Sequence, residues 1–183
     1  VVVTPFFFVF NNLRYLNTFL LRVGRQLAWV AILLMVIVIL LQVFFRYVLN
    51  NALPWPDEAA RFLMLWMTGL IAPSAYRWGG FVSIDMIISS MPKVAGNVLT
   101  LLLLILSLFI LIVGLKLGLQ HIKVGWIFNS SSIKIPLFLI GEQSKPIKLA
   151  WMYMSLPVGI SMLILVNIEL IFIRILSIIN PNL

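Results

Sequence analysis

The residues with the clearest potential for chemistry gather in one short stretch, FFRYVLNNALPWPDEAAR, between two apolar runs. Glu58 and Arg61 in this stretch are spaced one helical turn apart, so they can form an ion pair. We expect Arg46 and Arg61 to form a network of ion pairs with Asp57 and Glu58, with Trp55 as the anchor at the membrane interface. Such a network can hold two helices together, bind a partner protein, or do both.

Three more charged residues lie in or beside apolar runs and are further candidates: Arg77, Asp85 and Glu169. Glu169 lies deep in the last apolar run, where an ionised group is costly and is usually paired or functional. Arg174 follows five residues later, so these two side chains would meet imperfectly along one helix. We favour a hydrogen bond or ion pair from Glu169 to another helix or subunit over a role as a transport acid.

No pattern in the chain predicts an enzyme. There is one histidine, His121, and no cysteine, so metal sites and thiol nucleophiles lack their usual residues. The chain has no nucleophile motif, glycine-rich phosphate loop or paired-carboxylate motif. A membrane anchor that binds haem or quinone would need histidines within the spans, whereas His121 lies at the end of an apolar run. We therefore expect no enzymatic activity and no cofactor.

The composition indicates which elements position these residues. Apolar residues make up 63% of the 183 residues and charged residues only 10%, and the mean hydropathy is +1.15. In a typical soluble domain about a quarter of all residues are charged, so lipid must cover much of this chain. The apolar runs are about 20 residues long and lack the alternation of strands, which predicts an all-α membrane protein with one membrane domain over residues 1–183.

We predict four transmembrane helices, at residues 27–49, 57–76, 94–119 and 150–176. The turn Asn50-Asn51-Ala52-Leu53-Pro54 is so short that the first two helices must be antiparallel neighbours. Amphipathic helices at the membrane interface are predicted at 13–25, near the N-terminus, and at 81–92, in a connector. The more polar connector 124–148 is expected to contain a segment that dips back to the membrane.

The net charge of +8 does not predict nucleic-acid binding. The cations are scattered singly at the ends of apolar runs, which is typical of residues that anchor helices at phospholipid headgroups. Membrane lipids are therefore the expected partners of these cations. The distribution of Lys and Arg slightly favours an orientation with the N- and C-termini in the cytoplasm.

An independent four-helix secondary transporter or exporter is the main alternative to a scaffold. Secondary transporters have broken helices at matching places in their two halves, and Pro73 and Pro157 could form such a pair. However, the predicted spans 27–49 and 94–119 are unbroken and almost without polar side chains. A chain without a polar path of its own is more consistent with a brace for another subunit.

The first stretch resembles a known family. Phe45-Arg46-Tyr47, followed by Pro54-Trp55, Asp57-Glu58 and Arg61, is similar to the small, DctQ-type membrane subunit of TRAP transporters, the tripartite ATP-independent periplasmic transporters. The similarity continues in residues further along the chain: Trp66, Gly69, Ala72, Ala75, Arg77, Asp85, Gln143-Ser144, Pro146, Trp151, Tyr153 and Pro157.

The resemblance implies four spans in a bacterial inner membrane with both termini cytoplasmic. It also implies two protein partners, a large membrane subunit that carries the transport pathway and a periplasmic substrate-binding protein. The transported solute would be an organic acid, such as a C4-dicarboxylate or sialic acid, and a sodium or proton gradient would drive its import. In this context Arg46, Trp55, Asp57, Glu58, Arg61 and Arg77 are expected at the partner interface, with Asp85 and Glu169 as secondary candidates.

Overall fold

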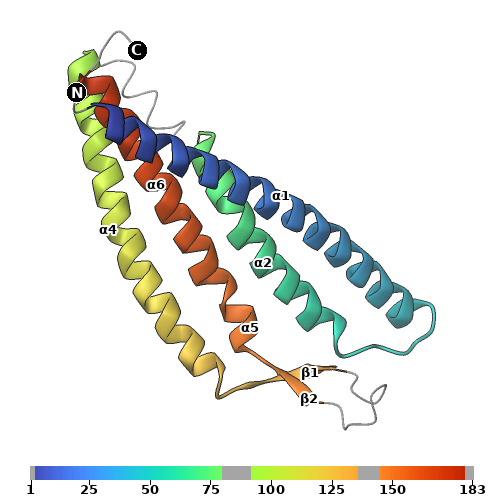
Figure 1. Cartoon of the computed structure of the whole chain (residues 1–183). Coiled ribbons are helices and arrows are strands. Elements are labelled where there is room, and N and C mark those ends of the chain that lie inside the picture. Colours follow the sequence, from blue (N-terminus) through green and yellow to red (C-terminus); the bar gives the residue numbers. More distant parts are fainter. Residues whose placement is uncertain (1–2, 80–91, 136–144, 180–183) are drawn as a thin grey trace.

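The computed structural model describes residues 3–79, 92–135 and 145–179 and confirms the all-α class (Figure 1). Its elements are the helices α1 (Val3–Tyr47), α2 (Pro56–Arg77), α4 (Lys93–Gly125), α5 (Ala150–Tyr153) and α6 (Ser155–Ile179), and the strands β1 (Asn129–Ile135) and β2 (Lys145–Lys148). The amphipathic connector predicted at 81–92 falls almost wholly outside the described residues.

Helix α1 is continuous over 45 residues, so the helix predicted at 13–25 forms, as part of one long helix that continues into the first span. The place of residues 13–25 at the membrane interface stays a prediction. At about 1.5 Å per residue α1 is about 67 Å long, roughly twice the thickness of a bilayer core. Its buried positions, Asn17, Leu21, Gly24, Ala28 and Ala31, recur every three or four residues and form one face of its middle part. That face packs against the rest of the chain, whereas the following turns of the helix are mostly exposed.

Helix α2 begins at Pro56, one residue before the predicted start, and ends at Arg77. Pro56 occupies the first turn, where its missing N–H costs nothing, and Asp57 and Glu58 lie near the positive end of the helix dipole. Pro73 is buried within the helix without ending it. The preceding turn contains Asn50 in the left-handed region, with φ of 49°, which asparagine tolerates well.

Three stretches in the described residues are long and apolar enough to cross a membrane: Asn11–Tyr47, Ala95–Gly125 and Ala150–Ile178. Helix α2 is not one of them, because charged residues in its first turns and the later polar residues Thr68, Ser74 and Tyr76 lower its mean hydropathy. Its 22 residues still extend about 33 Å. Three of the four predicted spans are thus supported by length and composition, and the span at 57–76 remains a prediction.

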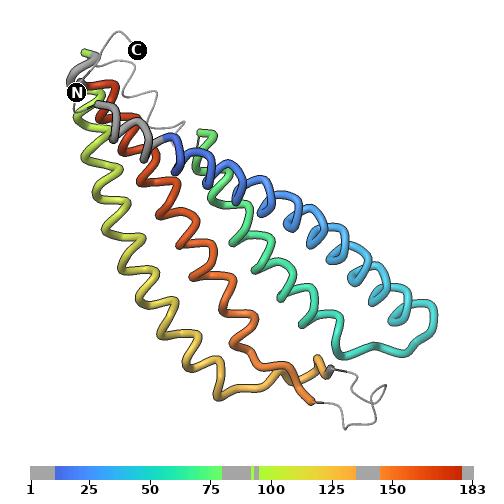
Figure 2. Tube along the Cα trace, viewed as in Figure 1, coloured from blue at the N-terminus to red at the C-terminus, as the bar shows by residue number. Residues whose placement is uncertain are grey.

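The four long helices lie in a single row in the order α1, α2, α6, α4 (Figures 1 and 2). The row converges where α1 begins and fans out toward the β-strands (Figure 2). At the centre, the backbones of α2 and α6 are in direct contact at Gly69 and Gly159. A Cβ atom added to Gly159 would lie only 2.7 Å from the carbonyl oxygen of Gly69. A single row leaves the outward faces of α1 and α4 uncovered, and Leu33 and Phe109 are 62% and 66% exposed.

The described residues of the connector 124–148 include an antiparallel strand pair, and the segment predicted to dip back to the membrane lies almost wholly outside the described residues. Strand β1 pairs with β2 through Asn129 opposite Lys148 and Ile135 opposite Lys145, with an irregular register between them. Residues 136–144 lie outside the described part of the chain. The last span is divided into α5 and α6, because Pro157 lacks an N–H and its ring conflicts with the carbonyl four residues earlier.

Candidate functional site

The structure divides the sequence-predicted site residues between the two ends of the row. Arg46, Trp55, Asp57, Glu58 and Arg61 lie at the end that carries the strands, which we call the loop end. Arg77 and Glu169 lie toward the opposite, convergent end. Glu58 and Arg77 are separated by 19 positions along α2, which corresponds to about 28 Å, so the two groups cannot act on one ligand. Asp85 lies outside the described residues.

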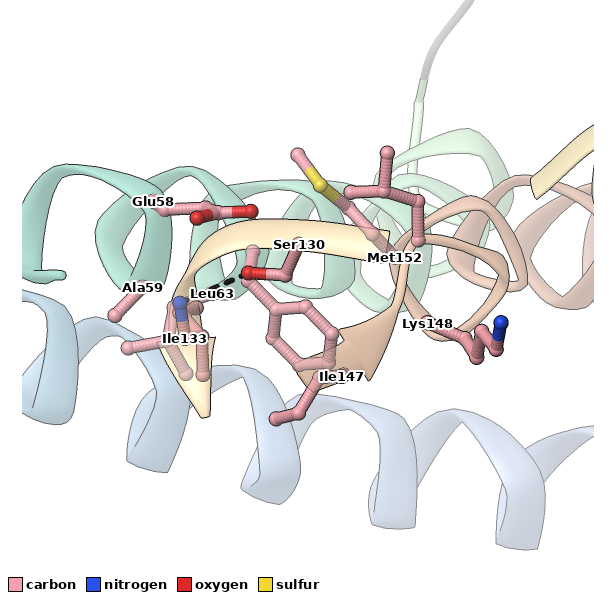
Figure 3. A pocket seen from close by; sticks show the side chains of 10 residues that line it. Glu58, Ala59, Leu63, Ser130, Ile133, Ile147, Lys148 and Met152 are labelled. Atoms are coloured by element: carbon pink, nitrogen blue, oxygen red, sulfur yellow. Dashed lines mark hydrogen bonds between the residues drawn. The ribbon is translucent and has the colours of Figure 1, made fainter. Parts of the chain in front are cut away.

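Glu58 attaches the strand β1 to the first turn of α2. Its Oε2 atom accepts a hydrogen bond of 3.0 Å from the Ser132 backbone N–H, a short one from the Ser132 hydroxyl, and a longer one of 3.4 Å from Ser131. Ser130 in turn accepts a hydrogen bond of 2.9 Å from the Ile133 N–H, which shapes the strand locally (dashed line in Figure 3). The carboxylate therefore joins segments that are more than 70 residues apart in the sequence.

The predicted ion network of Arg46, Arg61, Asp57 and Glu58 does not form. Among the described residues no ion pair joins any two of these four side chains, and Arg46 instead lies over the Tyr47 ring at 5.8 Å. Both arginines and Asp57 are exposed, so water can solvate them at little cost. Glu58 is satisfied by serine donors from β1, whose proximity to α2 the sequence did not indicate.

Two adjoining cavities flank Glu58 at the loop end. One has a volume of about 240 Å³ and is lined mainly by apolar side chains, including Phe62, Leu63, Ile133 and Ile147 (Figure 3). The other has a volume of about 320 Å³ and a polar lining that includes Asp57, Arg61, Ser131 and Ser132. Glu58, Leu149 and Met152 contribute to the walls of both cavities.

A buried polar cluster joins three helices at the convergent end. The Glu169 carboxylate on α6 is only 1% exposed and forms an ion pair of 2.5 Å with Arg77 on α2. Its other oxygen accepts a hydrogen bond of 2.7 Å from the Asn17 side chain on α1, and Arg77 also donates to Thr18 at 3.0 Å. The predicted pairing of Glu169 with another helix is thus realised within this chain, and Arg174 does not take part.

A second set of hydrogen bonds extends this cluster to α4. Asn167 donates to the Tyr76 hydroxyl at 2.7 Å, and that hydroxyl lies 3.3 Å from the Ser107 hydroxyl. The neighbours Tyr76 and Arg77 both bond to α6, and they also connect α2 to the two outer helices, Tyr76 to α4 and Arg77 to α1. Sequence reasoning missed Asn17, Asn167 and Ser107, although a polar side chain inside an apolar run was the available signal.

Comparison with known families adds one match. The family model described as "Tripartite ATP-independent periplasmic transporters, DctQ component" matches residues 35–176, which is well over half of the chain. The matched region contains α2, both strands, α4 and nearly all of α6. No curated protein matches the chain.

Proposed function

The chain belongs to the DctQ component family of the tripartite ATP-independent periplasmic transporters, and on this premise we propose that it is a non-catalytic scaffold subunit. It holds the large transport subunit in the membrane and helps to dock a periplasmic substrate-binding protein. The assembled transporter imports an organic acid, of the C4-dicarboxylate or sialic acid type, and uses an ion gradient.

The observation that carries this proposal is the way the row uses its polar groups. Glu169 on α6 bonds to Arg77 on α2 and to Asn17 on α1, so the polar atoms of these side chains hold the helices together instead of lining a transport path. The outer helices meanwhile present large uncovered apolar faces. In lipid such faces associate by packing rather than by the hydrophobic effect. A flat row with two open faces is suited to bracing a larger membrane protein.

The proposed orientation rests on the distribution of cations between the two ends of the row. Helix α1 begins and α6 ends at the same, convergent end (Figure 1). Arg14, Arg22 and Arg25 belong to the first part of α1, and Arg77 and Arg174 lie near the same end. The loop end carries seven of the 13 Lys and Arg residues, so a simple count does not decide the orientation. The positive-inside rule gives most weight to short loops and to the first helix, and with that weight it slightly favours the cytoplasm for the convergent end. We therefore place both termini in the cytoplasm of a bacterial inner membrane and the loop end on the periplasmic side.

Reconstitution tests this proposal directly. Vesicles that contain this chain, the large subunit and the binding protein should take up the organic acid, and vesicles that lack this chain should not. This chain should also co-purify with the large subunit from detergent. Full uptake without it, or its failure to co-purify, would contradict the scaffold role.

An independent transporter remains the second candidate, because Glu169 is an acid buried within an apolar helix. The same assay separates the two functions. Vesicles that contain this chain alone take up the acid if it is a transporter, and they take up none if it is a scaffold.

A further inference from the structure

We propose that the two adjoining cavities at the loop end bind one phospholipid whose zwitterionic headgroup ends in a primary ammonium. The acyl chain occupies the apolar cavity, and the headgroup occupies the polar cavity. This inference concerns the surface of this chain alone and does not depend on the proposed function.

The first argument is the opposite character of two spaces that share walls. Phe62, Leu63 and Ile147 line the apolar cavity, whereas Asp57 and Arg61 line the polar one. The shared wall residues make them one continuous amphipathic site. The apolar part, about 240 Å³, exceeds the roughly 150 Å³ of an engineered cavity that holds benzene. An empty space of this size would leave its wall atoms without contacts.

The second argument is the pair of opposite charges that line the polar cavity. Asp57 and Arg61 are spaced to form an ion pair along α2, yet neither has an ion pair in the described part of the chain. The Glu58 carboxylate lies between the two cavities and adds a second negative charge, although Ser131 and Ser132 already donate hydrogen bonds to it. A guanidinium recognises phosphate, and carboxylates recognise an ammonium that can donate hydrogen bonds.

The third argument is the depth of the site in the membrane. Trp55, Trp126 and Trp151 at the loop end are 37%, 51% and 50% exposed. Exposed tryptophans at one level of a membrane protein mark the layer of lipid headgroups. The apolar cavity is lined by the turns of α2 that follow this layer, where acyl chains are available.

The charges also select among lipids. The charged residues that line the two cavities are two acids, Asp57 and Glu58, and two cations, Arg61 and Lys148, and this balance suits a zwitterionic headgroup better than one with net negative charge. A choline headgroup cannot donate hydrogen bonds to the carboxylates. An acyl chain gains no hydrophobic free energy when it leaves the bilayer for the cavity. Selectivity must therefore come from the headgroup contacts, and we expect phosphatidylethanolamine to bind better than phosphatidylcholine and phosphatidylglycerol.

The experiment uses the full chain in nanodiscs with equal amounts of these three lipids. After extraction, the lipids that remain bound to the protein are quantified by native mass spectrometry. Phosphatidylethanolamine should be enriched, and Arg61→Gln or Asp57→Asn should lower its retention about threefold, the scale of an exposed charge contact. Arg46→Gln is the matched control, because Arg46 is an exposed cation at the same end that lines neither cavity.

Leu63→Trp tests the acyl cavity, because the larger side chain fills it. Met64→Trp is its matched control, because the neighbouring residue Met64 is exposed and lines neither cavity. Only the first should reduce retention. Ala59→Leu replaces Leu63→Trp if that variant does not fold. Equal retention of the three lipids, or equal effects of Arg61→Gln and Arg46→Gln, would overturn the proposal. A photoreactive group at residue 59 that crosslinks to protein instead of lipid would overturn it as well.

Discussion

Arg77 and Glu169 lie 92 residues apart in the sequence and form an ion pair of 2.5 Å between α2 and α6. The Glu169 side chain is almost completely buried, whereas the Arg77 side chain, at the end of α2, is 16% exposed. Breaking a buried pair by removing one partner costs more than the pair contributes, because a charge stays behind without compensation. The pair thus fixes the position of α2 against α6.

Replacing Glu169 by glutamine should destabilise the chain by about 2 kcal/mol, somewhat below the cost for fully buried pairs because Arg77 is partly exposed. The loss can be measured as a shift of the unfolding midpoint in detergent. Arg174→Gln is the control, because it removes an arginine of the same helix that does not contact Glu169, and it should leave the midpoint unchanged. An equal shift for both variants would show that the pair has no special role.

Removing the Tyr76 hydroxyl should cost about 1–2 kcal/mol, because Tyr76→Phe leaves the buried Asn167 amide without its acceptor. The same unfolding assay measures this change. Tyr15→Phe removes a hydroxyl from a side chain that is 78% exposed and should have no effect. If Tyr76→Phe were neutral as well, the hydrogen bond to α6 would not contribute to stability.

Gly159→Ala should force α2 and α6 apart, because the new methyl group would lie 2.7 Å from the Gly69 carbonyl oxygen and 2.9 Å from its Cα. Overpacking of this kind costs about 1–3 kcal/mol. Gly114→Ala is the matched control in α4, where a methyl group meets only the Ile160 Cδ1 atom at 3.5 Å. A Gly159→Ala variant as stable as Gly114→Ala would contradict the close backbone contact.

Glu58→Ala should release β1 from α2, since Ser131 and Ser132 lose their shared acceptor. Hydrogen exchange of the Ser132 amide should become faster, and the large subunit should co-purify less well if the loop end lies at the partner interface. Asp57→Ala removes a neighbouring acid that accepts no hydrogen bond from β1, so exchange at Ser132 should not change. Unchanged exchange in Glu58→Ala would show that β1 is held in another way.

The sequence by itself determined the class of protein and the positions of most helices. Long apolar runs with charges at their ends can be stable only as helices in lipid. Proline and acidic residues in a first turn are typical of a helix start, so Pro56, Asp57 and Glu58 predicted the start of α2 to within one residue. The same runs did not reveal that α1 is continuous beyond its predicted start, because arginines on one face of a helix do not interrupt its backbone.

Only the tertiary structure decided which charges pair. Neighbours in the sequence suggested an ion network around Glu58 and Arg61, yet both arginines of that stretch remain exposed and Glu58 binds serines of β1. The pair that forms joins Arg77 to Glu169, because the order of helices in the row brings α2 beside α6. An exposed charge can be satisfied by water, whereas a buried one requires a partner, and which partner is available depends on the packing of distant segments.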